Sequence, residues 1–244
     1  MTNIYFTPPT PTHSFQRGRK TLFMRRVLAI LVLILGTCSS FAQKYEIIDE
    51  YRYQLRNDEA ILTSNSTWKY TGDIVVPSKV KASDGKSYTV TEIEGGCFRD
   101  CKTVTSVTLP STISKIGGWS FAGCEQMKSV NIPSAVKSIS ERTFWDCTSL
   151  TTVNNKSFIK TLPGKCFSGC TSLRTINVPS TVTLFGEYCF EGCTSLEHIS
   201  IPSSVNTIGK YCFSNSGLKN IDIPKSITSL SHGCFSGLYL ETYD

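Results

Sequence analysis

The chain has 244 residues, 11 of them cysteine, and a formal net charge of +6. Five of its 25 basic residues precede residue 43, so the rest of the chain balances 20 basic residues against 19 acidic ones. Because nucleic-acid binders need a clustered basic footprint, this balance gives no support to a nucleic-acid partner.

Residues 1–42 have the three parts of a secretory signal, and their basic region has no acidic residue. An unbroken apolar run, Val27 to Leu35, is followed by Ser40-Phe41-Ala42, a small-x-small cleavage site. The run is too short for a permanent membrane span. We therefore expect cleavage after Ala42 and an exported protein that is extracellular, at the cell surface or outer membrane, or periplasmic.

Two alternatives concern this signal region. The segment from Met24, MRRVLAILVLILG, is a complete signal start, so translation beginning there would make residues 1–23 a mis-called extension. Cys38 raises the alternative of a lipid anchor. Thr37 stands where a lipid-attachment box has Gly or Ala, so simple cleavage is favoured.

Residues 43–73 have strand-like composition in three stretches, Tyr45–Asp49, Tyr51–Leu55 and Ala60–Thr63, with Asn57-Asp58 as a turn. We predict that this segment is an N-terminal β-hairpin cap. A partial repeat begins at Ile74.

A period of 23 residues governs the chain from there to residue 244, and it is marked by phenylalanine: Phe98, Phe121, Phe144, Phe167, Phe190 and Phe213, then Phe235 after 22. Further apolar columns follow the Phe at 6, 9, 11, 15 and 18 residues, except that the third unit has Asn155 at one of these positions and the sixth unit is one residue short. A fixed period of this length indicates a solenoid, in which each repeat stacks on the next. Residues 74–244 are thus predicted to form one domain of about six full repeats with partial ends.

Each repeat contains one stretch that alternates apolar and polar residues, such as Leu196 to Pro202, and it predicts a short strand that ends at the proline. Successive strands should lie side by side in a parallel sheet. The segment around Gly209 and Phe213 is expected to be a turn with a short helical piece. In the third repeat, Asn155 and Lys156 replace Ile and Pro, which predicts a bulge or weakened strand with Phe158 as a substitute.

The repeat unit resembles the BspA-like leucine-rich repeat, written roughly AFxxCxxLxxVxIPxxVxxIGxx, from about Ile74 onward. Cys often replaces the Ala that usually precedes the Phe. The resemblance implies a β-rich, right-handed, curved solenoid on an exported bacterial protein. It also implies a cell-surface role in binding or adhesion to a partner macromolecule.

Ten cysteines follow residue 42, in two columns of the repeat. Free buried thiols are favoured, because Cys packs like a small hydrophobe and Ser120 and Thr143 share one column. Disulfides are the second hypothesis. Zinc is the third, since the pairs of thiols lack a His at ligand spacing. We therefore predict no metal site.

The sequence contains no nucleophile elbow, HExxH, P-loop or GxGxxG motif. His198 and His232 are the only histidines after residue 42. We predict no catalytic residue, no cofactor and no enzymatic activity.

Outward-facing polar residues of the predicted strands form the candidate site, on one extended concave face. They are Ser106, Thr108, Ser129, Asn131, Thr152, Asn154, Thr175, Asn177, His198, Ser200, Asn220 and Asp222. A partner would be a protein, host extracellular matrix included, or a glycan. The alternative is polarity that only keeps the sheet soluble, which is favoured for any single residue; a structural envelope role without a ligand then follows.

A second candidate surface carries the aromatic residues Trp119, Tyr188 and Tyr211, all two residues before a repeat Phe, with Trp145 nearby. Such rings could stack on sugars, which gives the alternative of a glycan-binding protein. Packing over the turns is the favoured interpretation.

Overall fold

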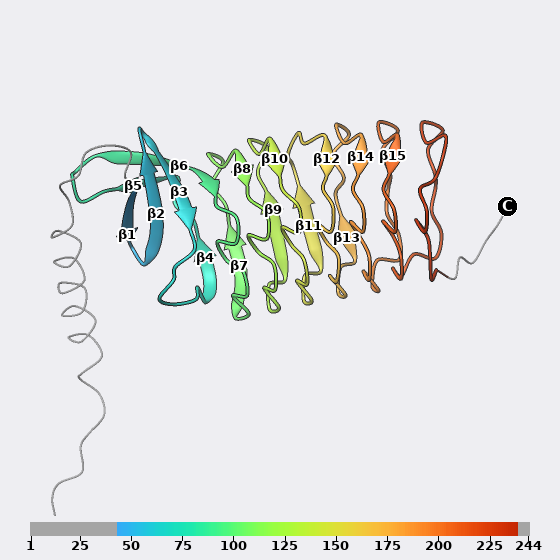
Figure 1. Ribbon diagram of the computed structural model, residues 1–244, viewed down its shortest axis with the longest axis horizontal. Coiled ribbons are helices and arrows are strands. Elements are labelled where there is room, and N and C mark those ends of the chain that lie inside the picture. The colour runs from blue at the N-terminus through green and yellow to red at the C-terminus, as the bar shows by residue number, and fades with distance from the viewer. Residues whose placement is uncertain (1–42, 239–244) are drawn as a thin grey trace, which may run out of the picture. The chain divides into compact units, whose positions relative to one another are not determined.

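The computed structural model describes residues 43–238 (Figure 1). The predictions for the signal region, namely cleavage after Ala42, a start at Met24 and a lipid anchor on Cys38, lie outside the described residues. Fifteen strands form in this range, and it contains no helix. The chain is therefore β-rich, as predicted.

The first three strands form an antiparallel meander: β1 (Lys44–Ile48) pairs with β2 (Tyr51–Arg56), which pairs with β3 (Glu59–Thr63). Strand β3 then pairs in parallel with β6 (Ser87–Ile93), while β5 (Lys79–Lys81) pairs with β6 in the antiparallel sense. The predicted strands are present and continue into the sheet of the repeats. That they act as a cap stays a prediction.

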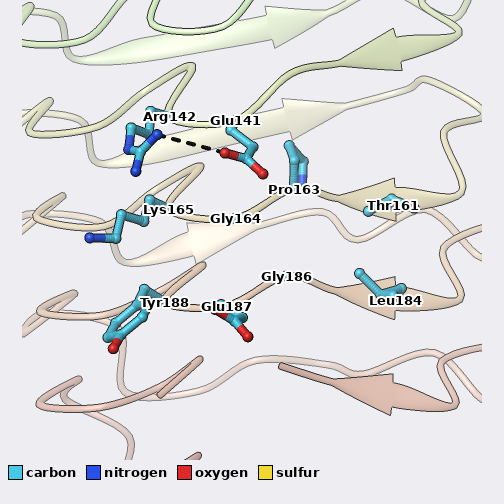
Figure 2. A pocket seen from close by; sticks show the side chains of 10 residues that line it. All are labelled: Glu141, Arg142, Thr161, Pro163, Gly164, Lys165, Leu184, Gly186, Glu187 and Tyr188. Atoms are coloured by element: carbon cyan, nitrogen blue, oxygen red, sulfur yellow. Dashed lines mark ion pairs between the residues drawn. The ribbon is translucent and has the colours of Figure 1, made fainter. Parts of the chain in front are cut away.

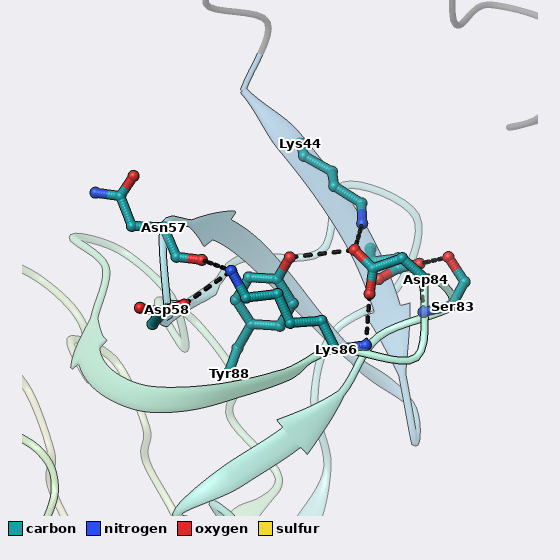
Figure 3. A network of polar contacts seen from close by, with 8 residues as sticks. Lys44, Asn57, Asp58, Ser83, Asp84, Lys86 and Tyr88 are labelled. Atoms are coloured by element: carbon teal, nitrogen blue, oxygen red, sulfur yellow. Dashed lines mark hydrogen bonds and ion pairs between the residues drawn. The ribbon is translucent and has the colours of Figure 1, made fainter.

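Polar contacts around Asp84 tie β1 to the turn between β5 and β6 (Figure 3). The ammonium of Lys44 lies 2.8 Å from the Asp84 carboxylate, to which the Tyr88 hydroxyl also donates at 3.2 Å. Nearby, Lys86 forms an ion pair with Asp58 at 2.8 Å. The hydrogen bond from Lys44 and the one from the Lys86 backbone N–H lower the pKa of Asp84 to about 2.

The predicted parallel strands form a ladder in the first repeats. Its members are β4 (Gly72–Val75), β7 (Val104–Thr108), β9 (Ser129–Ile132), β11 (Thr152–Asn155) and β13 (Thr175–Ile176). Their apolar side chains point into the core and the polar ones alternate outward. The strand alternation read from the sequence is therefore confirmed for these repeats.

A second ladder, which the sequence did not predict, uses two-residue strands about ten residues further along each repeat. It consists of two separate parts. In the first, β8 (Lys115–Ile116) and β10 (Ser138–Ile139) follow β6, and in the second, β12 (Thr161–Leu162), β14 (Leu184–Phe185) and β15 (Thr207–Ile208) pair with one another. The first repeats thus pair with their neighbours on two faces (Figure 1).

The expected helical piece after this second ladder is wrong, because the backbone there is left-handed both two residues before and two residues after the Phe of each repeat. The residue two before the Phe has φ between 54° and 60°, at Trp119, Arg142, Lys165, Tyr188 and Tyr211. An α-helix needs negative φ throughout. The chain instead returns through a series of tight turns.

The aligned phenylalanine rings form a continuous stack through the core. Neighbouring ring centroids from Phe98 to Phe235 lie 5.2–5.7 Å apart, with interplanar angles of 9° or less. All except the last ring, Phe235, are fully buried. The predicted shared interior is thus present.

The ten cysteines between residues 97 and 234 are buried, and none of them is disulfide-bonded. In the second column, each thiol from Cys124 to Cys193 donates to the carbonyl of the Phe 26 residues earlier, at 3.1–3.2 Å. Burial raises the pKa of these thiols, to about 12 for Cys193.

The third repeat departs from prediction. Strand β11 pairs with β9 over four residues without a register shift, so no bulge forms. Asn155 is buried, and its Oδ1 accepts hydrogen bonds from the backbone N–H and hydroxyl of Ser157, whereas its Nδ2 has no hydrogen-bond partner. Phe158 does not substitute for the missing apolar residue, because its side chain is 69% exposed.

The ladder of longer strands stops at β13, and the strand predicted over Leu196 to Pro202 is not formed. The apolar residues Ile199, Ile201 and Ile221 of the last repeats are only half-buried. Backbone hydrogen bonds still join these repeats, among them the bond from the Lys219 N–H to the Glu197 carbonyl at 3.2 Å and the bond from the Gly217 N–H to the Cys193 carbonyl at 3.0 Å.

Candidate binding surfaces

The twelve predicted site residues lie on one outer face of the strand ladder and its continuation, and we call them the outer strip. Ten are exposed, while Ser106 and Thr152 are half-buried. Strand pairing places Ser129 opposite Thr152, and Asn131 opposite Asn154. The register therefore aligns side chains of the same kind along the ladder.

Two hydrogen bonds link outer-strip side chains of neighbouring repeats. Asn154 Nδ2 donates to Asn131 Oδ1 at 2.9 Å, and His198 Nδ1 lies 2.9 Å from Asn220 Oδ1. These bonds hold the planar groups against their neighbours. A side chain held in this way loses less conformational freedom when a partner binds.

Asp73 and Val75, both on β4, extend the same outer face and were missed in the sequence. Asp73 Oδ1 accepts hydrogen bonds from Ser106 at 2.6 Å and Thr105 at 2.7 Å, which lower the pKa of Asp73. Val75 pairs with Thr108 and is 63% exposed. Alternation around Ile74, the start of the partial repeat, was the signal that could have found both residues.

The second candidate surface, which we call the aromatic flank, consists of Trp119, Trp145, Tyr188 and Tyr211. Its rings pack against one another and against cationic side chains. Trp119 has the Arg99 guanidinium 4.6 Å from its centroid and the Arg142 guanidinium at 4.8 Å, one from each neighbouring repeat. Trp145 meets Trp119 edge-on at 5.3 Å. The faces of Trp119 are therefore occupied.

The tyrosines of this flank are covered in the same manner. The Lys165 ammonium lies 4.8 Å over the Tyr188 ring, and Tyr188 stacks on Tyr211 at 5.1 Å. The His232 ring meets Tyr211 at 5.4 Å. Since sugar stacking needs an open ring face, these contacts support the packing interpretation of the aromatic residues. Arg142 and Lys165 also lie two residues before a repeat Phe, and these cations beside the rings were the sequence signal for this packing.

A groove of about 350 Å³ lies next to this flank, where the second ladder leads into the turns (Figure 2). Three successive repeats line it. The first contributes Glu141 and Arg142, the second Pro163, Gly164 and Lys165, and the third Leu184, Glu187 and Tyr188.

Residues 43–238 bear on both a metal site and a membrane span. No group of three or more His, Cys, Asp or Glu in this range could hold a metal ion. Nor does this range contain a helix long and apolar enough to cross a membrane.

Comparison with known families decides the identity of the repeat. The BspA type leucine rich repeat region matches residues 86–193 and 160–243, in six copies. The chain belongs to the BspA type leucine-rich repeat family. No curated protein matches the sequence.

Solved structures of bacterial leucine-rich repeat proteins resemble this one. A leucine rich cell surface protein from Faecalibacterium prausnitzii is 28% identical with a TM-score of 0.57, over 75% of this chain and 55% of the other. A leucine-rich repeat protein from Eubacterium ventriosum is 27% identical with a TM-score of 0.70, over 84% and 53%. The chain thus spans about half the length of these two relatives.

The pneumococcal vaccine antigen PcpA shares the fold. It is 20% identical with a TM-score of 0.54, over 77% of this chain and 51% of the other.

Proposed function

We propose that this BspA-type protein is an exported, non-enzymatic cell-surface module that binds a protein partner through the outer strip. One observation carries the proposal: outward polar side chains from paired strands are aligned in register on one face. Extended surfaces of stacked repeats are typical binding faces. The strip offers amides, hydroxyls and the carboxylate of Asp222, and the exposed charges of Lys128 and Glu197 lie beside it. These groups suit the polar surface of a folded protein.

Export is supported by the basic and apolar segments before Ala42 and by the cell-surface description of the relative from Faecalibacterium prausnitzii. The curved, right-handed course that the family resemblance implies belongs to the same proposal. Host extracellular matrix is the partner class to test first.

A structural envelope role without a ligand is the main alternative. Glycan binding by flank aromatics has less support, because Trp119, Tyr188 and Tyr211 already contact neighbouring side chains.

Retention of immobilised extracellular-matrix proteins tests the proposal. We expect the wild-type protein to bind at least one of them, and the triple variant Asn131→Ala/Asn154→Ala/Asn177→Ala to bind about tenfold more weakly or worse, since it loses three outward amides. Phe158→Ala, an exposed change outside the strip, is the matched control. Retention of no matrix protein would favour the envelope role, and unchanged affinity of the triple variant would remove the strip as the site.

A further inference from the structure

The groove on the flank is separate from the outer strip, and neither the family nor the proposed function accounts for it. Glu141, Gly164 and Glu187 occupy the same position of three successive repeats and form its centre (Figure 2). We propose that this groove binds a neutral sugar residue of a glycan, independently of the protein partner of the strip.

The groove exists because Gly164 has no side chain between two glutamates. A Cβ at Gly164 would lie 3.3 Å from the Glu187 carbonyl oxygen and 3.8 Å from the Glu141 carboxylate. The missing side chain leaves a groove of about 350 Å³, which is at the small end of ligand pockets and has room for a sugar ring.

Charges around the groove balance, and they favour a ligand that is neutral and rich in hydroxyls. Glu141 and Glu187 carry acceptors only, whereas Arg142 and Lys165 carry donors only. The Arg142 guanidinium lies 3.7 Å from the Glu141 carboxylate. A sugar hydroxyl donates and accepts at once, so it can join both kinds of group. A charged ligand would pair with the two groups of opposite charge and leave the two groups of its own charge without a partner.

Two departures from the repeat supply apolar surface in the same place. Pro163 stands where three other repeats have Gly117, Gly186 and Gly209. Leu184 stands where the other two-residue strands begin with Lys, Ser or Thr. Both line the groove, and together they offer the C–H face of a sugar ring an apolar contact.

The cationic side chains are already held in place. Arg142 packs 4.8 Å over the ring of Trp119, and Lys165 packs 4.8 Å over the ring of Tyr188. Holding these long side chains in advance reduces the entropy lost on binding. The flank rings therefore position the polar groups rather than stack on the sugar.

The test titrates the purified protein with methyl glucoside, methyl galactoside, methyl mannoside and N-acetylglucosamine, using ligand-observed saturation-transfer NMR. At least one of these sugars should bind. Gly164→Leu fills the groove and should weaken that binding by about tenfold or more, a loss of about 1.4 kcal/mol. Glu187→Gln, which removes one acceptor charge and keeps the backbone, should weaken it as well.

Gly95→Leu is the matched control, since Gly95 has the same position in an earlier repeat and a Cβ there would be 3.2 Å from the carbonyl oxygen of Gly118, which does not line the groove. It should bind sugar like the wild type, and so should the triple asparagine variant of the strip. Failure of all four sugars to bind overturns the groove proposal without touching the strip. Sugar binding by Gly164→Leu or Glu187→Gln that equals the wild type also overturns it. So does binding of an oligolysine peptide in place of sugar.

Discussion

The rings of Phe144 and Phe167, which are 23 residues apart, stack with centroids 5.3 Å apart and planes 3° from parallel. Both rings are fully buried and each lies between two further rings of the stack. Every repeat therefore completes the core of its neighbours, as expected of quasi-one-dimensional repeat proteins.

Phe167→Ala should lower the free energy of unfolding by about 3–5 kcal/mol, because it removes a large core side chain and leaves a cavity between two rings. Urea unfolding followed by circular dichroism measures this loss. Phe158→Ala is the control, since the Phe158 side chain is 69% exposed, and it should change stability by less than about 0.5 kcal/mol. A loss at Phe167 below about 1 kcal/mol would contradict its place in the stack.

The stack was predictable because one period carried both the aromatic and the aliphatic columns. The buried positions of Phe98 to Phe213 and the parallel strands β7, β9 and β11 follow from that period. The second ladder was not predictable from alternation, since a strand of two residues such as Lys115–Ile116 has no pattern to read.

Gly209→Ala should destabilise the fold by about 1–3 kcal/mol, because repeats approach too closely there for a side chain. A Cβ at Gly209 would lie 2.6 Å from the Glu187 backbone nitrogen. Gly164→Ala is the matched control, with its closest contact at 3.3 Å, and should cost clearly less in urea unfolding. Equal losses in the two variants would show that the close approach does not decide the effect.

Alkaline pH should destabilise the protein through its buried thiols. The thiols of an unfolded chain lose protons near pH 9, whereas burial raises the pKa of Cys193 to about 12 in the folded chain. The folded state thus binds more protons above pH 9, and the free energy of unfolding falls as pH rises from there. Cys193→Ala should reduce this slope by about 1 kcal/mol per pH unit.

Urea unfolding at several pH values between 8 and 11 measures the slope. Native alkylation at pH 8 gives an independent check, in which the ten thiols should resist labelling until denaturant is added. Rapid labelling of the folded protein would contradict their burial, and denatured protein with few reactive thiols would show disulfides instead.

Lys44→Ala should raise the pKa of Asp84 from about 2 back toward 3.8, because the Lys44 hydrogen bond is the largest cause of the depression. The depressed pKa makes the Asp84 contacts favourable above about pH 4, and they are lost as pH falls through 2. The Lys86 amide signal in NMR reports the titration, since that N–H donates to Asp84 Oδ1 at 2.9 Å. An unchanged midpoint in Lys44→Ala would contradict this assignment.

The candidate surfaces were only partly predictable. The outer strip follows from strand alternation, which fixes the face on which Asn131 and Asn154 lie. The groove does not follow from it, because it depends on turns with positive φ at Arg142 and Lys165, and bulky residues give no sequence signal for that conformation. The hydrogen bonds that Ser157 donates to the buried Oδ1 of Asn155 were likewise not predictable, because they depend on the local course of the backbone.

The side-chain amide signals of Asn131, Asn154 and Asn177 test the central claim most directly. In NMR spectra recorded during titration with a retained extracellular-matrix protein, these three signals should shift or broaden first, while the flank side chain of Trp145 stays unchanged. Unchanged asparagine signals in a saturated complex, with the flank signals moving instead, would contradict the assignment of the outer strip as the binding face.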